Sequence, residues 1–268
     1  MALPDPAPSS AALVTGASSG IGEAIARQLA QRGHNLILVA RREERLRELA
    51  AELSDAHGIR AEPLAADLGT RPARDELAAS IQALGLDVEV LVNNAGFGGT
   101  GNVHRVEPER LMAMVALNCE ALVDLQARYS APMAERGRGA IINVASTAAF
   151  QPIPGTATYA ATKAFVLALS EGTHAELTGK GVAVTAVCPG PVKTEFAETA
   201  GLGDANDRMP SFIWTDVEDV ASQAVEGAEK GRRVVVPGLM NRVGTLAGRH
   251  TPRALVLPLA KRTWRQAL

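Results

Sequence analysis

Seven short apolar runs alternate along this chain with longer stretches of helical periodicity. Three of the runs, LILVA, AIINVA and VAVTAV, are apolar at nearly every position, which is typical of parallel strands covered by helices on both faces. Strands that alternate with helices predict a doubly wound α/β fold with right-handed crossovers. We expect strands at 12–15, 35–40, 59–65, 88–92, 140–145, 182–187 and 234–236, and helices near 20–32, 42–56, 71–84, 108–131, 157–178 and 216–230.

A chain of 268 residues, 47% of them hydrophobic, is long enough for one large α/β domain. We place this domain at residues 11–237. It follows a lead-in at 1–10, where several prolines and the lack of a basic, apolar leader predict disorder and no signal peptide. Residues 238–268 form an extension after the last expected strand. The sequence has no uninterrupted apolar stretch of about eighteen residues, so we expect no transmembrane helix.

Cys119 and Cys188 each lie inside an apolar segment. Two buried free thiols fit a reducing compartment better than a disulfide or a nucleophile would, so we expect a cytoplasmic protein. The five histidines are scattered without the spacing of metal ligands, and we expect no metal site.

A glycine-rich segment, TGASSGIG at residues 15–22, follows the first expected strand and opens the first expected helix. Glycines allow a tight turn and a close approach to a pyrophosphate, which then meets the amide groups at the start of the helix. The glycine spacing departs from the common G-x-G-x-x-G pattern. The position between a strand and a helix nevertheless indicates a dinucleotide-binding loop.

The segment YAATK, residues 159–163, places one of the chain's two tyrosines four residues ahead of a lysine. On a helix these two side chains lie on one face, one turn apart. An ammonium near a phenol stabilises the phenolate, which suits a general acid that gives and takes a proton. The alternative is a half-buried tyrosine on a helix that also carries a surface lysine, and the spacing alone favours this alternative.

Four motifs together resemble the short-chain dehydrogenase/reductase family. They are TGASSGIG, NNAG at 93–96 after the fourth strand, Ser146 after the fifth strand, and Tyr159 with Lys163. The resemblance covers roughly residues 11–237. It implies a single domain with a Rossmann-type sheet of seven parallel strands, and hydride transfer between a nicotinamide nucleotide and a carbonyl or alcohol. The alternative is a non-catalytic NADP-binding regulator or scaffold, which could lose the serine, tyrosine or lysine without penalty.

The resemblance implies a role for each of four catalytic residues. Tyr159 would protonate the carbonyl oxygen during reduction, and Lys163 would lower the pKa of Tyr159 and bind the nicotinamide ribose. Ser146 would hydrogen-bond the substrate oxygen and stabilise its developing charge. Asn118 would hold a water of the proton relay through Lys163; its alternative is a buried amide with a local hydrogen bond.

The resemblance also implies a set of cofactor-binding residues. Besides Tyr159 and Lys163, these are Gly16, Ser18, Ser19, Gly20, Ile21 and Gly22 in the loop, Asn94, Ala95 and Gly96 on the adenosine side, and Pro189, Gly190, Val192 and Thr194 at the nicotinamide face. Asp67, after the third strand, would contact the adenine. Its alternative is a capping role near the next helix.

Arg41 and Arg42 follow the second expected strand, where an NAD-preferring site would carry an acidic residue for the ribose 2′-hydroxyl. A guanidinium pairs well with a 2′-phosphate, so we expect NADP (NADPH) in preference to NAD. The alternative is that both arginines belong to a solvated helix face, in which Glu43 and Arg47 form a stabilising pair.

Candidate side chains for the substrate pocket are mostly apolar and carry few fixed charges. They are Phe97, Phe150, Ile153, Phe196, Leu202, Met209, Phe212 and Trp214, and plain packing is the alternative for each. We therefore expect a small-molecule carbonyl or secondary-alcohol substrate of apolar or acyl-bearing type. The chain also resembles, more loosely, the ketoacyl-reductase and hydroxysteroid-dehydrogenase-like members of the family.

The expected helix at 157–178 is apolar nearly all the way round, which indicates a second buried face. The family commonly assembles through this helix and the one at 108–131. We expect a homodimer or a homotetramer.

From Lys230 onward there are nine Lys or Arg and no Asp or Glu, whereas the first 229 residues have a balance of −11. One interpretation is that residues 238–268 pack on the protein's own acidic body or on a neighbouring subunit. The other is a peripheral membrane contact, or a docking face for an acidic acyl carrier. A nucleic-acid partner is not expected, because the rest of the molecule would repel it.

Overall fold

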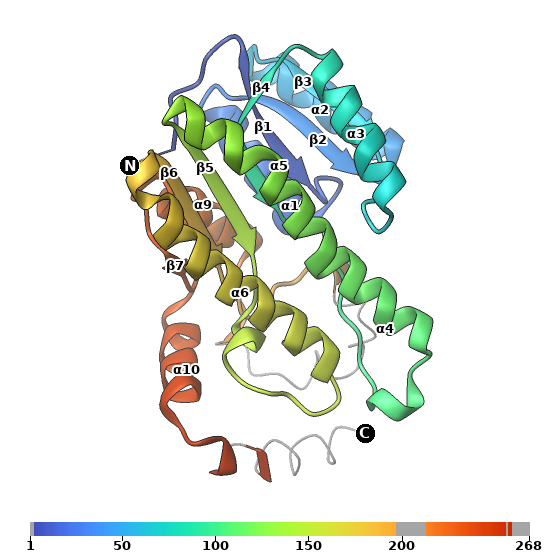
Figure 1. Cartoon of the computed structure of the whole chain (residues 1–268), viewed down its shortest axis with the longest axis vertical. Helices are drawn as coiled ribbons and strands as arrows, with labels where there is room; N and C mark the ends of the chain where they lie inside the picture. Colours follow the sequence, from blue (N-terminus) through green and yellow to red (C-terminus); the bar gives the residue numbers. More distant parts are fainter. Residues whose placement is uncertain (1–2, 197–212, 256, 259–268) are drawn as a thin grey trace.

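The structure is a computed structural model that describes residues 3–196, 213–255 and 257–258. Seven parallel strands form one sheet in the order β3-β2-β1-β4-β5-β6-β7 (Figure 1). The strands are β1 (Ser10–Thr15), β2 (Asn35–Ala40), β3 (Ala61–Ala65), β4 (Asp87–Asn93), β5 (Gly139–Val144), β6 (Val182–Val187) and β7 (Val234–Val235). The predicted Rossmann-type doubly wound sheet is therefore confirmed.

Helices pack on both faces of this sheet, as the doubly apolar strands predict. The helices are α1 (Gly20–Gln31), α2 (Glu43–His57), α3 (Arg71–Ala83), α4 (Pro108–Val115), α5 (Ala121–Arg136), α6 (Ala157–Leu177), α9 (Val217–Glu229) and α10 (Leu239–His250). Short helical turns lie at η1 (Val103–Arg105), η2 (Ala116–Glu120), η3 (Thr147–Phe150) and η4 (Thr178–Lys180).

Side chains of β1 show how the two layers arise from the alternation along a strand. Ala12 and Val14 pack into one core with residues of α1, α2 and α9. Ala11 and Leu13 point the other way, into a second core with residues of α3, α5 and α6. Because the central strands are covered on both faces, a ligand can reach the sheet only at the strand ends.

The strand order reverses direction between β1 and β4, and a cleft opens at this point beyond the carboxyl ends of the strands. Thr15, the last residue of β1, joins the two strands there. Its Oγ1 donates to the carbonyl of Val92 at 3.0 Å and accepts from the amides of Asn94 and Ala95, each at 3.0 Å. One threonine thus fixes the loop after β4 against the glycine-rich loop after β1.

The expected helix at 108–131 is divided in the structure. A π-helical turn, η2, separates α4 from α5, and α5 continues to Arg136. A π turn contains one extra residue and turns the side chains that follow it to a new direction. Here the turn carries Asn118, one of the expected catalytic residues.

Residues 3–9 differ from the disordered lead-in that the sequence predicts. Leu3 packs against the first core, and the amide of Asn35 donates to the carbonyls of Ala7 at 3.2 Å and Ser10 at 3.0 Å. Strand β1 also begins at Ser10, two residues earlier than predicted.

The extension after β7 begins with α10, a helix of 12 residues. The segment 259–268, with the predicted contact residues Lys261, Arg262, Trp264 and Arg265, lies outside the described residues. Across the described part of the chain, no helix has both the length and the apolar character needed to cross a membrane.

Candidate active site

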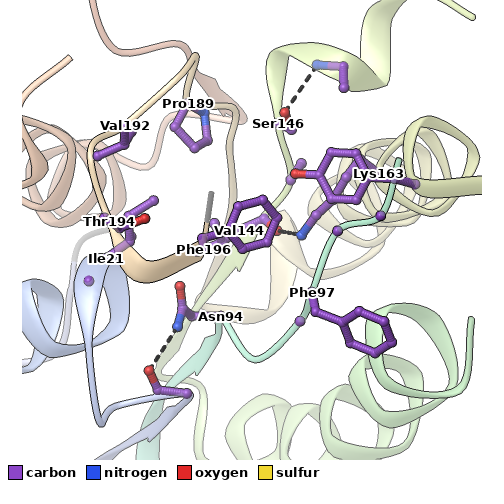
Figure 2. Close-up of a pocket in the computed structure, with 18 of the residues that line it drawn as sticks. Ile21, Asn94, Phe97, Val144, Ser146, Lys163, Pro189, Val192, Thr194 and Phe196 are labelled. Carbon is purple, nitrogen blue, oxygen red and sulfur yellow. Dashed lines mark hydrogen bonds between the residues drawn. The ribbon is translucent and has the colours of Figure 1, made fainter. Parts of the chain in front are cut away.

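A cavity of about 1600 Å³ occupies the cleft at the carboxyl end of the sheet (Figure 2). Its walls come from the loops after β1, β2, β3, β4, β5 and β6, together with α6 and α10. Of the twenty different residues expected at the catalytic and cofactor sites, the cavity wall contains all except Gly22 and Asn118. The sequence motifs are therefore brought to one place.

Tyr159 and Lys163 lie one turn apart on α6, as the spacing predicts. Lys163 is buried, with 5% of its surface exposed. Its Nζ donates to the carbonyl of Val144 at the end of β5 at 2.8 Å, and it lies 5.8 Å from the centre of the Tyr159 ring. The bond to Val144 holds the ammonium beneath the cavity floor, next to the phenol (Figure 2).

Burial dominates the protonation of both side chains. It raises the pKa of Tyr159 to about 12, and the hydrogen bond with Ser146 opposes this only in part. Burial also lowers the pKa of Lys163 to about 8. In the protein without nucleotide, desolvation of the phenolate is the main influence on the pKa of Tyr159, and the lowering of this pKa by Lys163 stays a prediction. A phenol that keeps its proton at neutral pH is suited to donate one.

Ser146 is the second residue after β5, which ends at Val144, and it caps the turn η3. Its Oγ accepts a hydrogen bond from the amide of Ala148 at 3.1 Å (Figure 2). The same hydroxyl hydrogen-bonds Tyr159, so the two hydroxyl groups lie together at the cavity wall. The pair can therefore present two O–H groups to one substrate oxygen.

Asn118 holds the loop after β4 through two hydrogen bonds to one residue. Its Oδ1 accepts from the amide of Phe97 at 3.1 Å, and its Nδ2 donates to the carbonyl of Phe97 at 3.0 Å and to Oγ1 of Thr162 at 3.1 Å. The side chain is 2% exposed. These contacts correspond to the local hydrogen-bonding alternative, and they fix the Phe97 backbone beside the catalytic helix.

The glycine-rich loop has the backbone that a phosphate cradle requires. Gly16 and Gly20 adopt φ values of +65° and +58°, which other residues rarely take. A Cβ on Gly22 would lie 2.3 Å from the carbonyl oxygen of Gly16, so the helix start and the loop are in direct contact. The amide groups at the start of α1 face the cavity, and the loop residues present fit a pyrophosphate.

Arg42, rather than Arg41, lies across the glycine-rich loop. Its Nε donates to Oγ of Ser18 at 3.1 Å and its Nη2 to the Ser18 carbonyl at 3.1 Å. Its Nη1 donates to Oε2 of Glu195 at 2.8 Å. Arg41 lines the same end of the cavity with an exposed side chain. Both guanidinium groups thus flank the position at the end of β2 that binds the adenosine ribose in such folds.

Asp67 also lines this end of the cavity, and its Oδ1 accepts from the amide of Gly69 at 3.1 Å. This bond forms a turn ahead of α3 and does not cap the helix, whose N-cap is Thr70. The second carboxylate oxygen is available for a nucleotide.

The segment 189–194 crosses the cavity opposite the catalytic residues. Thr194 lies against the glycine-rich loop, with its Cγ2 3.2 Å from where a Cβ on Gly20 would be, and Val192 pairs as a bridge with Thr215 (Figure 2). Phe196 follows, and its ring centre is 5.8 Å from that of Tyr159. The segment therefore reaches from the glycine-rich loop to the catalytic tyrosine.

The expected substrate residues within the described part of the chain all reach the cavity wall. They are Phe97, Phe150, Ile153, Phe196 and Trp214. Leu202, Met209 and Phe212 lie outside the described residues.

The sequence reasoning missed Arg110 and the inner face of α10. Five residues of α10 line the substrate half of the cavity: Met240, Asn241, Gly244, Thr245 and Gly248. Asn241 fastens this helix, because its Nδ2 donates to Oγ1 of Thr215 at 3.0 Å and to the carbonyl of Pro237 at 3.1 Å. Gly244, Thr245 and Gly248 follow Asn241 at spacings of three or four residues. This spacing of small residues was the sequence signal that one face of a helix could line the cavity.

The sheet and the cleft define a dinucleotide-binding oxidoreductase of the doubly wound α/β class. Comparison with known proteins narrows this class. The family model described as short chain dehydrogenase matches residues 10–204, and the chain therefore belongs to the short-chain dehydrogenase/reductase family.

Individual relatives extend the comparison over most of the chain. The NADP-dependent 3-hydroxy acid dehydrogenase YdfG of Escherichia coli is 40% identical over 218 residues, covering 80% of this chain and 86% of the relative. A short-chain dehydrogenase from Sphingobium yanoikuyae, solved in complex with NADPH, is 37% identical with a TM-score of 0.79, covering 89% of this chain and 92% of that one. The bulky-bulky ketone specific alcohol dehydrogenase from Comamonas testosteroni is 31% identical with a TM-score of 0.76, covering 98% and 96%.

Proposed function

We propose that this protein is an NADP-dependent oxidoreductase that transfers a hydride between the nicotinamide and a carbonyl or secondary alcohol. The observation that carries the proposal is the meeting of Ser146, Tyr159 and Lys163 at one side of a cleft whose other side is a phosphate cradle. The nucleotide supplies the hydride for reduction and accepts it for oxidation.

In the direction of reduction, Tyr159 donates its phenolic proton to the carbonyl oxygen as negative charge develops there. Ser146 donates a second hydrogen bond to the same oxygen, which lowers the barrier by stabilising that charge. Lys163 binds the nicotinamide ribose with the donors that its bond to Val144 leaves over. Asn118 keeps the loop at Phe97 in register with α6, and we propose that it also holds a water for the proton relay.

The preference for NADP is supported by the charge at the end of β2. No acidic side chain follows the strand until Glu43, whereas Arg41 and Arg42 both border the cavity. The name of YdfG specifies NADP, and the Sphingobium enzyme was solved with NADPH. The loop residues hold the pyrophosphate, Asp67 and the segment 94–96 border the adenosine, and the segment 189–194 borders the nicotinamide.

An apolar or acyl-bearing substrate is supported by the aromatic and aliphatic lining of the remaining cavity. Phe150, Ile153 and Trp214 line this cavity. The similar Comamonas enzyme is named for bulky ketones, and YdfG for 3-hydroxy acids. A ketone or 3-oxoacyl compound with a sizeable apolar group fits both the lining and these names.

A homodimer or homotetramer is supported by exposed apolar side chains on the helices that the family uses for assembly. Met112 on α4 is 66% exposed, Val123 on α5 38% and Phe165 on α6 43%. Burial of these side chains between subunits would remove apolar surface from water. The free thiols of Cys119 and Cys188 support a reducing compartment such as the cytoplasm.

The test is a turnover screen of the purified protein with NADPH and NADH against ketones, 3-oxoacyl thioesters and steroids. We expect NADPH oxidation with at least one apolar carbonyl compound and weaker use of NADH. Tight NADPH binding without turnover on any member of the panel would instead support the non-catalytic regulator or scaffold.

A further inference from the structure

The helix α10 has an inner face that lines the cavity and an outer face whose apolar side chains are exposed to solvent. Leu239, Val243 and Leu246 lie four and three residues apart, which places them on one stripe of the helix. Their side chains are 74%, 55% and 62% exposed. Single exposed apolar residues are ordinary, but a stripe of three along one helix indicates a contact surface.

The orientation of α10 is fixed by its attachments, so this stripe is held outward. Arg242 donates from Nε to the carbonyl of Val236 at 2.8 Å and from Nη2 to Oε1 of Gln223 at 3.1 Å. Asn241 ties the first turn to Thr215. The helix cannot rotate its apolar stripe toward the body without breaking these bonds.

Basic side chains accompany the stripe without any acidic counterpart. Residues 238–268 contain six Lys or Arg and no Asp or Glu, while the preceding 237 residues contain 21 basic and 29 acidic side chains. Arg249 and Arg253 are exposed at the end of α10 and just beyond it. Leu255 and Leu257 continue the apolar surface with exposures of 66% and 42%.

We propose that the outer face of α10, with Leu255 and Leu257 just beyond it, docks on an anionic lipid surface. An apolar stripe bordered by basic side chains on a helix of low overall hydrophobicity is the pattern of an interfacial helix. Charge complementarity directs the surface to anionic headgroups, because the extension is positive while the body is negative. The five exposed apolar side chains of this surface are far fewer than the roughly 20–30 residues a side of a stable protein interface, so a second copy is a poorer occupant.

Docking in this orientation places the catalytic cleft beside the lipid surface, since the same helix forms the wall of the cavity. Met240 illustrates the connection: its side chain is 48% exposed and also lines the cavity. Given the function proposed above, on which this step rests, a carbonyl compound dissolved in the lipid would reach Tyr159 past α10.

The experiment is co-sedimentation of the full chain with vesicles, which requires no turnover and so is independent of the proposed activity. Vesicles of phosphatidylcholine alone are compared with vesicles in which one third of the lipid is phosphatidylglycerol, at about 50 mM and about 500 mM NaCl. We expect binding to the anionic vesicles at low salt and its loss at high salt or on phosphatidylcholine.

Val243→Asp tests the stripe, and Val103→Asp is its matched control, because both valines are 55% exposed and neither lines the cavity. Val243→Asp should weaken vesicle binding by roughly tenfold or more, the cost of withdrawing one apolar side chain from the lipid and adding a charge. Val103→Asp should bind like the unchanged protein. Leu246→Asp repeats the test at a second position, and the melting temperature of each variant checks that it folds.

Three results would overturn the proposal. The first is no binding of the intact chain to anionic vesicles at low salt. The second is equal vesicle binding by Val243→Asp, Leu246→Asp and Val103→Asp. The third is a combination of two observations: Val243→Asp has a lower oligomer mass in light scattering, and the intact chain does not bind vesicles. This combination would assign the stripe to a contact with a second copy.

Discussion

Lys163 and Val144 are joined by a hydrogen bond of 2.8 Å that runs from the buried ammonium to the last carbonyl of β5. The bond uses one of the three ammonium hydrogens and directs the other two toward the cleft. It also ties α6 to the strand that ends just before Ser146. The sheet itself therefore sets the relative position of the serine, the tyrosine and the lysine.

Tyr159→Phe removes the phenolic hydroxyl proposed as the proton donor. The ring is kept, so the fold should be unaffected. Because the phenol is the proposed acid in the reduction, we expect turnover to fall by at least ~10²-fold, with little change in NADPH affinity or melting temperature. Steady-state kinetics and nucleotide titration measure the two effects. Lys163→Ala should lower both turnover and NADPH affinity, because one ammonium serves both.

Tyr129→Phe is the control, since Tyr129 is the only other tyrosine. It lies on α5 and packs against the second core, and its hydroxyl is buried without a hydrogen-bond partner among the described residues. Loss of that hydroxyl should leave turnover unchanged. Near-normal turnover by Tyr159→Phe with the best substrate found would refute the proposed mechanism.

Lys163 makes a contribution to stability that depends on pH in a known direction. Burial lowers its pKa from 10.5 to about 8, so between these values the unfolded chain binds more protons than the folded protein. The free energy of unfolding contributed by Lys163 therefore rises with pH from about 8 to about 10. Tyr159, whose pKa burial raises from 10.0 to about 12, acts in the opposite direction only above this window.

The measurement is urea unfolding of the cofactor-free protein at several pH values in this window, for the unchanged protein and Lys163→Met. We expect the difference in unfolding free energy between the two to shift with pH in favour of the unchanged protein. Lys230→Met is the control, because Lys230 is on the surface with its side chain 53% exposed. A difference that does not vary with pH would mean that Lys163 is not buried as described.

The parts of this site that follow regular strands could be predicted from the sequence. Runs such as VAVTAV mark a strand by composition alone, and Ser146 and the loop at 15–22 follow such runs directly. Asn118 and Arg42 were harder to interpret. The π turn at Asn118 interrupts a continuous helical pattern, and Arg42 takes its place through contacts with Ser18 and Glu195, which are 24 and 153 residues away. Local patterns do not report such distant contacts.

Arg41→Ala and Arg42→Ala should have different effects on nucleotide choice. Arg41 borders the cavity, so its loss should weaken NADPH binding by about 1.5–3 kcal/mol, the value of a charged hydrogen bond, and leave NADH nearly unchanged. Arg42 also supports the Ser18 backbone, so its loss should weaken both nucleotides. Isothermal titration with each nucleotide separates the cases. Equal losses for both nucleotides in Arg41→Ala would assign Arg41 to a solvated helix face and reopen the cofactor preference.

Glu195→Gln should strengthen NADPH binding. The Glu195 carboxylate lies 2.8 Å from Nη1 of Arg42, and this hydrogen bond is the main cause that lowers the pKa of Glu195. A 2′-phosphate bound at the same end of the cleft must share Arg42 with that carboxylate and is repelled by its charge. Since the pair is exposed, the gain should be modest, about two- to fivefold in the dissociation constant, and smaller at high salt.

Glu43→Gln is the matched control for this change, because Glu43 is an exposed carboxylate next to Arg42 in sequence that pairs with Arg47 instead. It should leave the NADPH dissociation constant unchanged, and neither variant should alter NADH binding, which lacks the 2′-phosphate. If Glu195→Gln instead weakens NADPH binding, the carboxylate must act by orienting Arg42 toward the phosphate rather than by competing with it. Fluorescence titration of both variants with both nucleotides distinguishes these two roles, since only competition predicts an affinity gain confined to NADPH.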